Sequence, residues 1–360
     1  MKKVLTGIAV LTMFSALAQD STTVETNKLS LSGYVEAFYG YDFNKPVDNN
    51  RPSFIYSHNR HNEFNVNLAF LRGSYSAARV RGNLALAVGT YMNANYAAEQ
   101  RVLKNIYEAN AGVKLSKTSN LWLDIGIVPS HIGFESAISK DCWTLTRSLL
   151  AENSPYFESG AKLSYTSNNG NVSLAALALN GWQRITRVGG NSLMSWGTQI
   201  TVKPGDKTSL NYSAFLGTDK PDSVRLWRIY HNLYAIIQFN DKIGFTAGFD
   251  IGTEQKTKGS DEKNTWYSPV GILRFTPNAN WAIAVRGEFF NDENGVIIAT
   301  GTDNGFKTSG FSLNVDRSFG QHFLWRIEYR TFNSKDAIFV KQETSKQNNS
   351  AITTSFALSF

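Results

Sequence analysis

Two short stretches of the chain carry charged residues at a spacing of two. They hold Arg286 and Glu288 in one stretch, and Arg326, Glu328 and Arg330 in the other. Because side chains alternate between the two faces of a β-strand, each set would point in one direction. Charges along the wall of a channel can select ions by their sign. The same charges can instead pair with one another and only stiffen a wet interior, and the spacing leaves both interpretations open.

Signals for an enzyme or a metal centre are weak. The chain contains no Gly-x-Ser-x-Gly elbow, no phosphate-binding loop and no Gly-x-Gly-x-x-Gly motif. His58 and His61 stand at a spacing that could start a metal site, but Glu63 is their one obvious carboxylate partner. Cys142 is the single cysteine, so an internal disulfide is excluded. We therefore expect no catalytic residue, no metal and no cofactor.

The rest of the sequence is dominated by alternation between apolar residues and small or polar ones. In KIGFTAGFDIG, for example, the apolar residues at 243, 245, 247, 249 and 251 alternate with Gly, Thr and Asp. A period of two indicates half-buried β-strands, whereas an amphipathic helix would show spacings of three and four. The pattern predicts about 16 segments of about 10 residues, the length of a tilted membrane-spanning strand. They fall at 29–41, 62–75, 79–91, 105–116, 120–128, 156–165, 171–181, 193–203, 208–217, 227–239, 243–252, 265–276, 280–290, 306–316, 321–332 and 350–360.

The connections between these segments alternate in length. Long links such as 42–61 and 129–155 alternate with short turns such as TSNNG, KPGDK and FNDK. Outer-membrane barrels have long extracellular loops at one rim, short periplasmic turns at the other, and an even number of strands. A soluble β-sandwich would also show alternation, but it predicts loops of unordered lengths and commonly disulfides. We therefore predict an all-β fold, a transmembrane antiparallel β-barrel of about 16 strands.

Within such a barrel, the period of two assigns a side to each charge. An Arg that faced lipid at mid-membrane would cost about 2–4 kcal/mol, so the charged residues of the strands should face the lumen. Beyond the two Arg/Glu stretches, this face holds Arg81, Lys114, Glu36, Glu63, Glu108, Glu158, Lys162 and Arg274. The inward positions of one predicted strand hold Gly244, Gly248 and Gly252. These glycines could leave a smooth wall for a folded-in loop, or they could reflect only that a strand tolerates glycine.

The chain begins like an exported protein. Two lysines precede an apolar run at 4–17, and Ala-Leu-Ala at 16–18 offers a small-x-small cleavage site. A membrane anchor is the alternative, but the run is shorter than the roughly 20 residues of a spanning helix. We predict a signal peptide at 1–18, a short periplasmic lead-in at 19–28 and the barrel at 29–360. Loss of the two lysines lowers the formal net charge from +7 to +5, a spread basicity that does not suggest a nucleic-acid partner.

The chain ends on the fully alternating stretch SAITTSFALSF at 350–360. We predict that this strand pairs with the strand at 29–41 to close the barrel. Its terminal Phe360 resembles the signal that the outer-membrane assembly machinery reads on barrel proteins. Three tryptophans fall near strand ends on the long-loop side, Trp182, Trp227 and Trp266, and Trp281 falls near the turn side. An interfacial aromatic girdle is expected at both places.

Four stretches of the sequence look familiar: HNRHNEFNVNLAFLRG at 58–73, GFESAISKDCWTLTRSLLAENSPYFESGAKL at 133–163, WAIAVRGEFFND at 281–292 and WRIEYR at 325–330. They resemble one family, the OmpL-like β-barrel porins of Gram-negative outer membranes. The resemblance covers nearly the whole chain after the signal peptide. It implies an outer-membrane, porin-like barrel and leaves the solute open.

The longest link, 129–155, follows the fifth strand. In general porins the loop at this place folds into the pore and narrows it, and we expect this loop to be the constriction here. Its field would come from Glu135, Asp141, Arg147 and Glu152. The alternative is an external cap over the mouth. The stretch DCWTLTRSLLAENSP also favours a short helix with a cap at Thr144 and an end at Pro155.

The sequence thus predicts an outer-membrane porin for passive diffusion of small hydrophilic solutes. The net charge and the inward arginines lean weakly towards anions. The expected partners are outer-membrane lipid, the assembly machinery and the solutes, and a homotrimer is usual for porins of this strand count. The alternative is a binding or structural barrel that its own loops plug.

Overall fold

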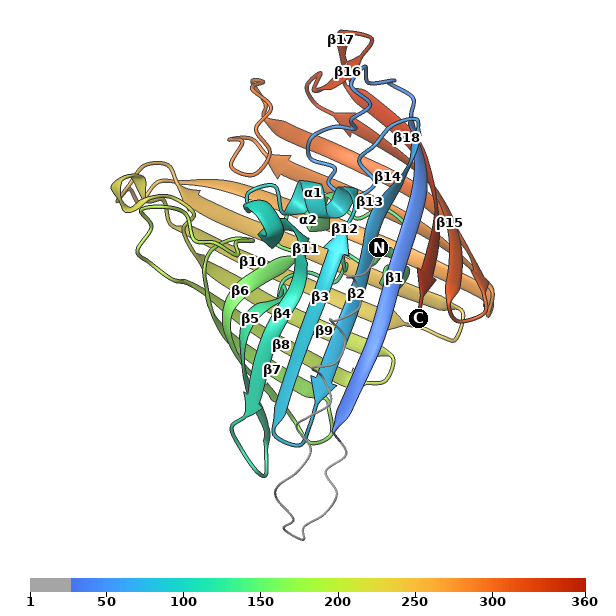
Figure 1. Ribbon diagram of the computed structural model, residues 1–360. Helices are drawn as coiled ribbons and strands as arrows, with labels where there is room; N and C mark the ends of the chain where they lie inside the picture. Colours follow the sequence, from blue (N-terminus) through green and yellow to red (C-terminus); the bar gives the residue numbers. More distant parts are fainter. Residues whose placement is uncertain (1–26) are drawn as a thin grey trace, which may run out of the picture.

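In the computed structural model, which describes residues 27–360, the chain folds into a closed antiparallel barrel (Figure 1). Its wall runs in the order β1, β18, β15 and then stepwise down to β2, which pairs with β1. The wall strands are β1 (Lys28–Asp42), β2 (Glu63–Ser76), β3 (Val80–Val88), β4 (Ile106–Lys114), β5 (Asn120–Pro129), β6 (Phe157–Thr166), β7 (Val172–Leu179), β8 (Ser195–Gly205), β9 (Thr208–Gly217), β10 (Arg228–Gln238), β11 (Ile243–Gln255), β12 (Lys263–Asn278), β13 (Trp281–Asp292), β14 (Phe306–Phe319), β15 (Phe323–Ser334) and β18 (Asn348–Ser359).

These 16 strands confirm the predicted barrel. Every segment expected from the alternation coincides with a strand, and the ends differ by at most three residues. The seam is also as predicted, because β18 pairs with β1 from Ser359 opposite Tyr34 to Ala351 opposite Asp42. Closure leaves no wall strand with an unpaired edge, as a β-structure in lipid requires. The predicted signal peptide lies outside the described residues.

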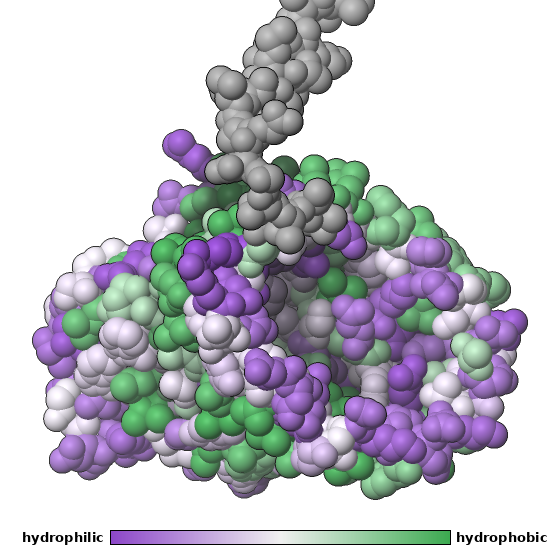
Figure 2. Space-filling model, turned by 90° about the horizontal axis from the view of Figure 1, so that it is seen from below, coloured by the Kyte–Doolittle hydropathy of each residue, from purple (hydrophilic) through white to green (hydrophobic). Residues whose placement is uncertain are grey.

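The long connections gather at one rim of the barrel and the short turns at the other (Figure 1). Figure 2 views the short-turn end, which is hollowed and has many hydrophilic side chains around the hollow. Among the described residues, no helix is long and apolar enough to cross a membrane. The long loops contain α1 (Thr90–Asn95), α2 (Leu149–Glu152), short 3₁₀ turns at Arg101–Asn105, Ser139–Asp141 and Asp222–Val224, and a hairpin of β16 (Phe339–Lys341) and β17 (Thr344–Lys346).

The sequence-based parity is wrong in the second half of β2. Simple alternation places Leu68 on the lipid face together with Phe64, yet Phe64 is 87% exposed and Leu68 is fully buried. The reason is a register shift in the β1–β2 ladder that leaves Asn67 without a partner residue. An extra residue of this kind, a β-bulge, moves every later side chain to the opposite face. Arg72 therefore points inward, where it pairs with Glu108 over 2.8 Å.

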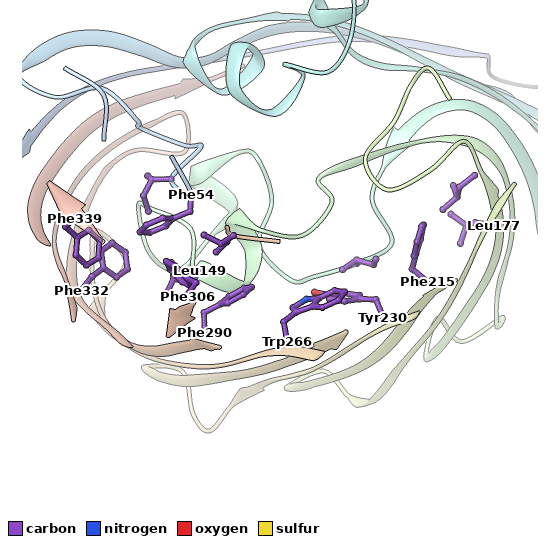
Figure 3. Close-up of a cluster of buried hydrophobic side chains, with 14 residues drawn as sticks. Phe54, Leu149, Leu177, Phe215, Tyr230, Trp266, Phe290, Phe306, Phe332 and Phe339 are labelled. Carbon is purple, nitrogen blue, oxygen red and sulfur yellow. The ribbon is translucent and has the colours of Figure 1, made fainter. Parts of the chain in front are cut away.

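Aromatic side chains form a belt on the inner wall near the long-loop end (Figure 3). We call them the inner aromatic belt; they are Phe215, Tyr230, Trp266, Phe290, Phe306 and Phe332. Residues of four loops, including Phe54, Leu149, Ile298 and Phe339, belong to the same cluster, and Trp182 packs against it. The belt and these residues bury apolar surface together, which holds the loops inside the rim.

The expected interfacial girdle is therefore wrong for Trp182 and Trp266. Trp266 is 1% exposed and stacks on Tyr230 with ring centroids 6.1 Å apart. It faces inward opposite Gly252, where a Cβ would collide with the indole ring. Trp182 packs edge-on against Tyr230 at 4.8 Å. Both tryptophans contribute to the interior and not to the lipid boundary.

The terminal Phe360 also takes part in the seam. Its N–H donates to the carbonyl of Gly33 over 3.0 Å, and its carbonyl accepts from the N–H of Gly33 over 2.8 Å. The Phe360 ring fills the space beside Gly33, so that a side chain at that position would collide with it.

Deletion of Phe360 is expected to lower the amount of barrel in the outer membrane several-fold, because both the seam contact and the terminal aromatic are lost. Quantitative blotting of membrane fractions measures this. Phe319→Ala is a matched control, since Phe319 is another exposed aromatic residue at a short turn. Normal assembly of the shortened chain would contradict the role given to Phe360.

Candidate functional site

The connection between β5 and β6, which we call the inner loop (residues 129–155), lies against inward-facing side chains of the wall. The N–H of Leu149 donates to Glu288 Oε2 over 2.6 Å, and the N–H of Thr146 donates to Glu328 Oε2 over 2.6 Å. Glu288 and Glu328 are on β13 and β15, and their parity turns them inward. Bonds of a backbone N–H to a carboxylate are charge-assisted and strong. Two wall carboxylates thus hold the backbone of the inner loop.

Two arginines of the same wall complete this arrangement. Arg286 donates to the carbonyl of Thr146 over 2.7 Å and pairs with Glu328 over 2.8 Å. Arg330 pairs with Glu288 over 2.7 Å. Each of these four charged side chains is at most 1% exposed. The alternating Arg and Glu residues therefore pair with one another beneath the loop and form no water-exposed ring.

A third arginine ties the loop to β14. Arg326 is fully buried, pairs with Asp316 over 2.8 Å and donates to the carbonyl of Cys142 over 3.0 Å. Nearby, the hydroxyl groups of Ser139 in the loop and Tyr34 on β1 are 3.0 Å apart. We call the five wall residues Arg286, Glu288, Arg326, Glu328 and Arg330 the loop seat.

Inside the loop, Arg147 and Glu135 are also buried. Arg147 donates to the carbonyls of Ser136 and Ala137 over 2.5 and 2.9 Å. Glu135 accepts from the N–H of Ser148 over 3.0 Å. Both side chains therefore hold the shape of the loop itself, and neither is open to solvent.

The predicted helix of the inner loop is present but shorter and capped differently. It is the single turn α2, and Ser148 caps it by accepting from the N–H of Ala151 over 3.2 Å. The prediction of Thr144 as the cap is wrong, because its hydroxyl donates to the carbonyl of Thr146 over 3.0 Å and accepts from Arg286. Ser148 has the extended backbone that an N-cap requires and directly precedes the turn.

Glu152, at the end of α2, joins the inner loop to the loop after β1. Its carboxylate accepts from the N–H groups of Tyr56 and Ser57 over 2.9 and 3.1 Å. Burial raises the pKa of Glu152 to about 7, and the two N–H groups only partly oppose that shift. Glu152 therefore takes up its negative charge only near neutral pH, and its burial opposes that charge.

Two aromatic side chains of the inner loop rest on the glycines of β11. A Cβ at Gly248 would lie 2.6 Å from the ring of Phe134, and one at Gly244 would lie 2.8 Å from the ring of Trp143. Of the two interpretations of this glycine row, the structure supports the wall that accommodates a folded-in loop. The glycine spacing signalled this contact, but it did not indicate which loop residues make it.

A separate part of the wall, on β2 to β6, remains more open. Arg72 pairs with Glu108 over 2.8 Å, and Arg81 bonds to Asp124 over 2.7 Å. The arginines are 25% and 37% exposed, whereas their acidic partners are only 8% and 7% exposed. A cavity of about 340 Å³ adjoins this region and is also lined by Lys162. The solvent-facing charge of this strip is thus mainly basic.

The residues predicted for the site separate into two groups. The buried group lies in the inner loop and the loop seat: Arg147, Glu152, Glu135, Arg286, Glu288, Arg326, Glu328 and Arg330. Arg81 and Lys114 lie on β3 and β4 and are partly exposed, and Asp141 is exposed. Sequence reasoning missed Asp316, which shares the inward parity of β14, and Arg72, which the bulge turns inward.

No group of three or more His, Cys, Asp or Glu residues suited to a metal ion occurs in residues 27–360. His58 lies 3.2 Å from Glu36, whereas Nδ1 of His61 accepts from the N–H of Asp42 over 2.9 Å. The two histidines therefore serve different structural contacts.

Comparison with solved structures places this fold among outer-membrane channels. The anion-selective porin from Comamonas acidovorans superposes with a TM-score of 0.59 at 9% identity, over 93% of this chain and 100% of that one. The outer membrane channel DcaP of Acinetobacter baumannii gives 0.57 at 12% identity, over 96% and 100%. The trimer form of OmpT from Vibrio cholerae gives 0.57 at 9% identity, over 92% and 99%. At these identities the likeness concerns the fold.

Comparison with sequences is more specific. No curated protein matches the chain. The family model described as "Putative beta-barrel porin-2, OmpL-like" matches residues 28–360, which is the entire barrel. The chain therefore belongs to the OmpL-like β-barrel porin family.

Proposed function

We propose that the protein is a porin through which small hydrophilic solutes diffuse passively across the outer membrane, with the inner loop as its constriction. The observation that carries the proposal is the contact of the inner loop with the loop seat, which leaves the polar strip on β2 to β6 beside it. A polar wall and a narrowed lumen are sufficient for selective diffusion, so no catalytic chemistry or cofactor is needed. The predicted signal peptide at 1–18 would direct export.

Deletion of residues 136–150 tests the constriction. Single-channel conductance in planar bilayers is expected to rise several-fold, because the deleted residues occupy part of the lumen. Deletion of residues 257–260, in an exposed loop between β11 and β12, is the control and should leave the conductance unchanged. An unchanged conductance after the first deletion would exclude the inner loop as the constriction.

A second candidate function is a binding or structural barrel that its loops plug. The inner aromatic belt favours it, because apolar contacts there hold several loops inside the long-loop rim. The intact protein in a planar bilayer separates the two: steady current steps support the porin, and persistent silence supports the plugged barrel.

The partly exposed basic strip on β2 to β6 supports a preference for anions. Exchanging charge with Arg81→Glu and Lys162→Glu together is expected to move the reversal potential in a salt gradient towards cations, because the open strip becomes acidic. Lys341→Glu, at the tip of the exposed β16–β17 hairpin, is the control and should have little effect. A cation preference of the unaltered protein would contradict the proposed role of this strip.

The partners follow from the same proposal. Apolar residues on the outward faces, such as Leu273 and Phe311, would contact outer-membrane lipid. The assembly machinery would read Phe360 at the chain end. The trimer form recorded for the fold relative from Vibrio cholerae supports a homotrimer here as well.

A further inference from the structure

A cavity of about 440 Å³ lies at the long-loop end, between the loop after β1, the loop after β13 and the β16–β17 hairpin. Its lining shares no residue with the loop seat or with the basic strip. Its size is within the range of small-molecule sites, which is about 300–1,000 Å³. The residues that matter for its chemistry are Asp42, Arg51, Phe54, Ile298, Phe339 and Asn349.

Arg51 is the unusual member of this lining. Its side chain is 1% exposed, yet none of its three guanidinium nitrogens has a hydrogen-bond partner within residues 27–360. The nearest carboxylate is that of Asp42, whose Oδ2 lies 3.9 Å from Nε. Burying a charged donor without partners is costly. The guanidinium is therefore suited to a carboxylate supplied from outside, which it can bind through two parallel bonds.

The groups beside Arg51 do not suit a simple anion. Asp42 accepts from Nδ2 of Asn349 over 2.8 Å and from the N–H of Asn44 over 2.8 Å, and Asp48 adds a second negative charge at the rim. The Nδ2 bond to a carboxylate fixes the orientation of the Asn349 amide. Its Oδ1 is buried and has no partner in the described part of the chain. This acceptor, on an amide that also bonds to Asp42, is suited to an ammonium group.

Another part of the cavity wall is apolar. Phe54, Ile298 and Phe339 are each at most 7% exposed and belong to the cluster around the inner aromatic belt. Figure 3 shows Phe54 close to Phe306, and Phe332 beside Phe339, on this side of the barrel. A ligand that reached this wall would bury an apolar side chain.

We propose that this cavity binds α-amino acids with an apolar side chain. The carboxylate would bond to Arg51, the ammonium group would donate to Asn349 Oδ1 and Asp42, and the side chain would contact Phe54 and Phe339. The inference goes beyond the proposed porin function, because binding at this site does not require conduction.

Isothermal titration calorimetry of the purified, detergent-solubilised barrel tests the proposal with three probes of similar shape. L-leucine carries both charged groups, 4-methylpentanoate lacks the ammonium group, and 3-methylbutylamine lacks the carboxylate. Leucine is expected to bind. Each analogue should bind at least about tenfold more weakly than leucine, since each leaves a buried polar group unpaired. Absence of leucine binding at millimolar concentration, or equal binding of 4-methylpentanoate, would overturn the proposal.

Variants locate the site. Arg51→Gln should abolish leucine binding, and Arg51→Lys should retain part of it. Arg60→Gln is the matched control, because Arg60 is in the same loop but forms a partly exposed pair with Glu63. Leucine binding to Arg51→Gln at the affinity of the unaltered protein would overturn the assignment. If Arg51→Gln does not fold, the three probes on the unaltered barrel still test whether the cavity recognises both charged groups of leucine. If the barrel binds leucine but carries no current in bilayers, the result supports this site and contradicts only the proposed conduction.

Discussion

Replacing Arg286 with alanine is expected to release the inner loop. The change leaves Glu328 without its 2.8 Å partner and removes the bond to the carbonyl of Thr146. Breaking one side of a buried ion pair costs about 3–5 kcal/mol, because the remaining charge is uncompensated. Backbone hydrogen bonds between neighbouring strands hold the wall independently of the loop. The inner loop should therefore detach from the wall before the barrel unfolds. Single-channel conductance should rise and become noisier.

Limited trypsin digestion gives a second measurement of the same change. Arg147 is fully buried in the intact loop, so cleavage after it should be slow in the unaltered protein and fast in Arg286→Ala. Arg60→Ala is the matched control, since the Arg60–Glu63 pair is 26% and 30% exposed and such pairs contribute only about 0–1 kcal/mol. If neither the conductance nor the cleavage at Arg147 changes in Arg286→Ala, the loop seat does not hold the loop.

The folded protein is expected to lose stability as the pH rises, because burial disfavours the charged form of Glu152. Burial raises the pKa of Glu152 from 4.5 to about 7 in the folded chain, so the folded state holds its proton more tightly than the unfolded state does. The stabilisation is therefore complete below about pH 4.5 and is lost as the pH rises through about 7. The loss amounts to roughly 3 kcal/mol at most. The thermal midpoint should fall between pH 5 and pH 8.

Glu152→Gln tests this assignment, because the amide oxygen can still accept from Tyr56 and Ser57 but does not titrate. The thermal midpoint should depend less on pH in this variant. It is measured from the shift in gel mobility that accompanies thermal unfolding of the barrel. Glu262→Gln is the control, since Glu262 is exposed and its pair with Lys256 lies outside the barrel wall. An unchanged pH profile in Glu152→Gln would show that another group is responsible.

Much of the fold could be predicted from local pattern. The alternation at 243–251 and its counterparts located every wall strand, because a strand that separates lipid from a lumen must change polarity at each residue. The alternating lengths of the connections predicted the even strand count. The bulge at Asn67 could not be predicted from the pattern, because it depends on how β2 aligns with β1. Simple alternation would place Arg72 on the lipid face. Such a placement is costly, and it was the one sign in the sequence of an irregularity in β2.

The site was predicted less completely than the fold. Parity correctly turned Arg286, Glu288 and Glu328 inward, but it could not indicate that the inner loop covers them. The partners come from different strands and from a loop more than a hundred residues earlier in the chain, as the bond from Thr146 to Glu328 illustrates. Whether an inward charge meets water or another charge depends on these distant contacts.

The sequence by itself determined the strands, their number, the closing seam at 350–360 and the face of most side chains, because these follow from a period of two that each strand carries alone. Only the tertiary structure decided what covers each face. It placed the inner loop on the loop seat, turned Trp266 into the inner aromatic belt and left Arg51 buried without a partner. These features depend on contacts between segments distant in the chain, and the alternation within one strand does not specify which residues make them.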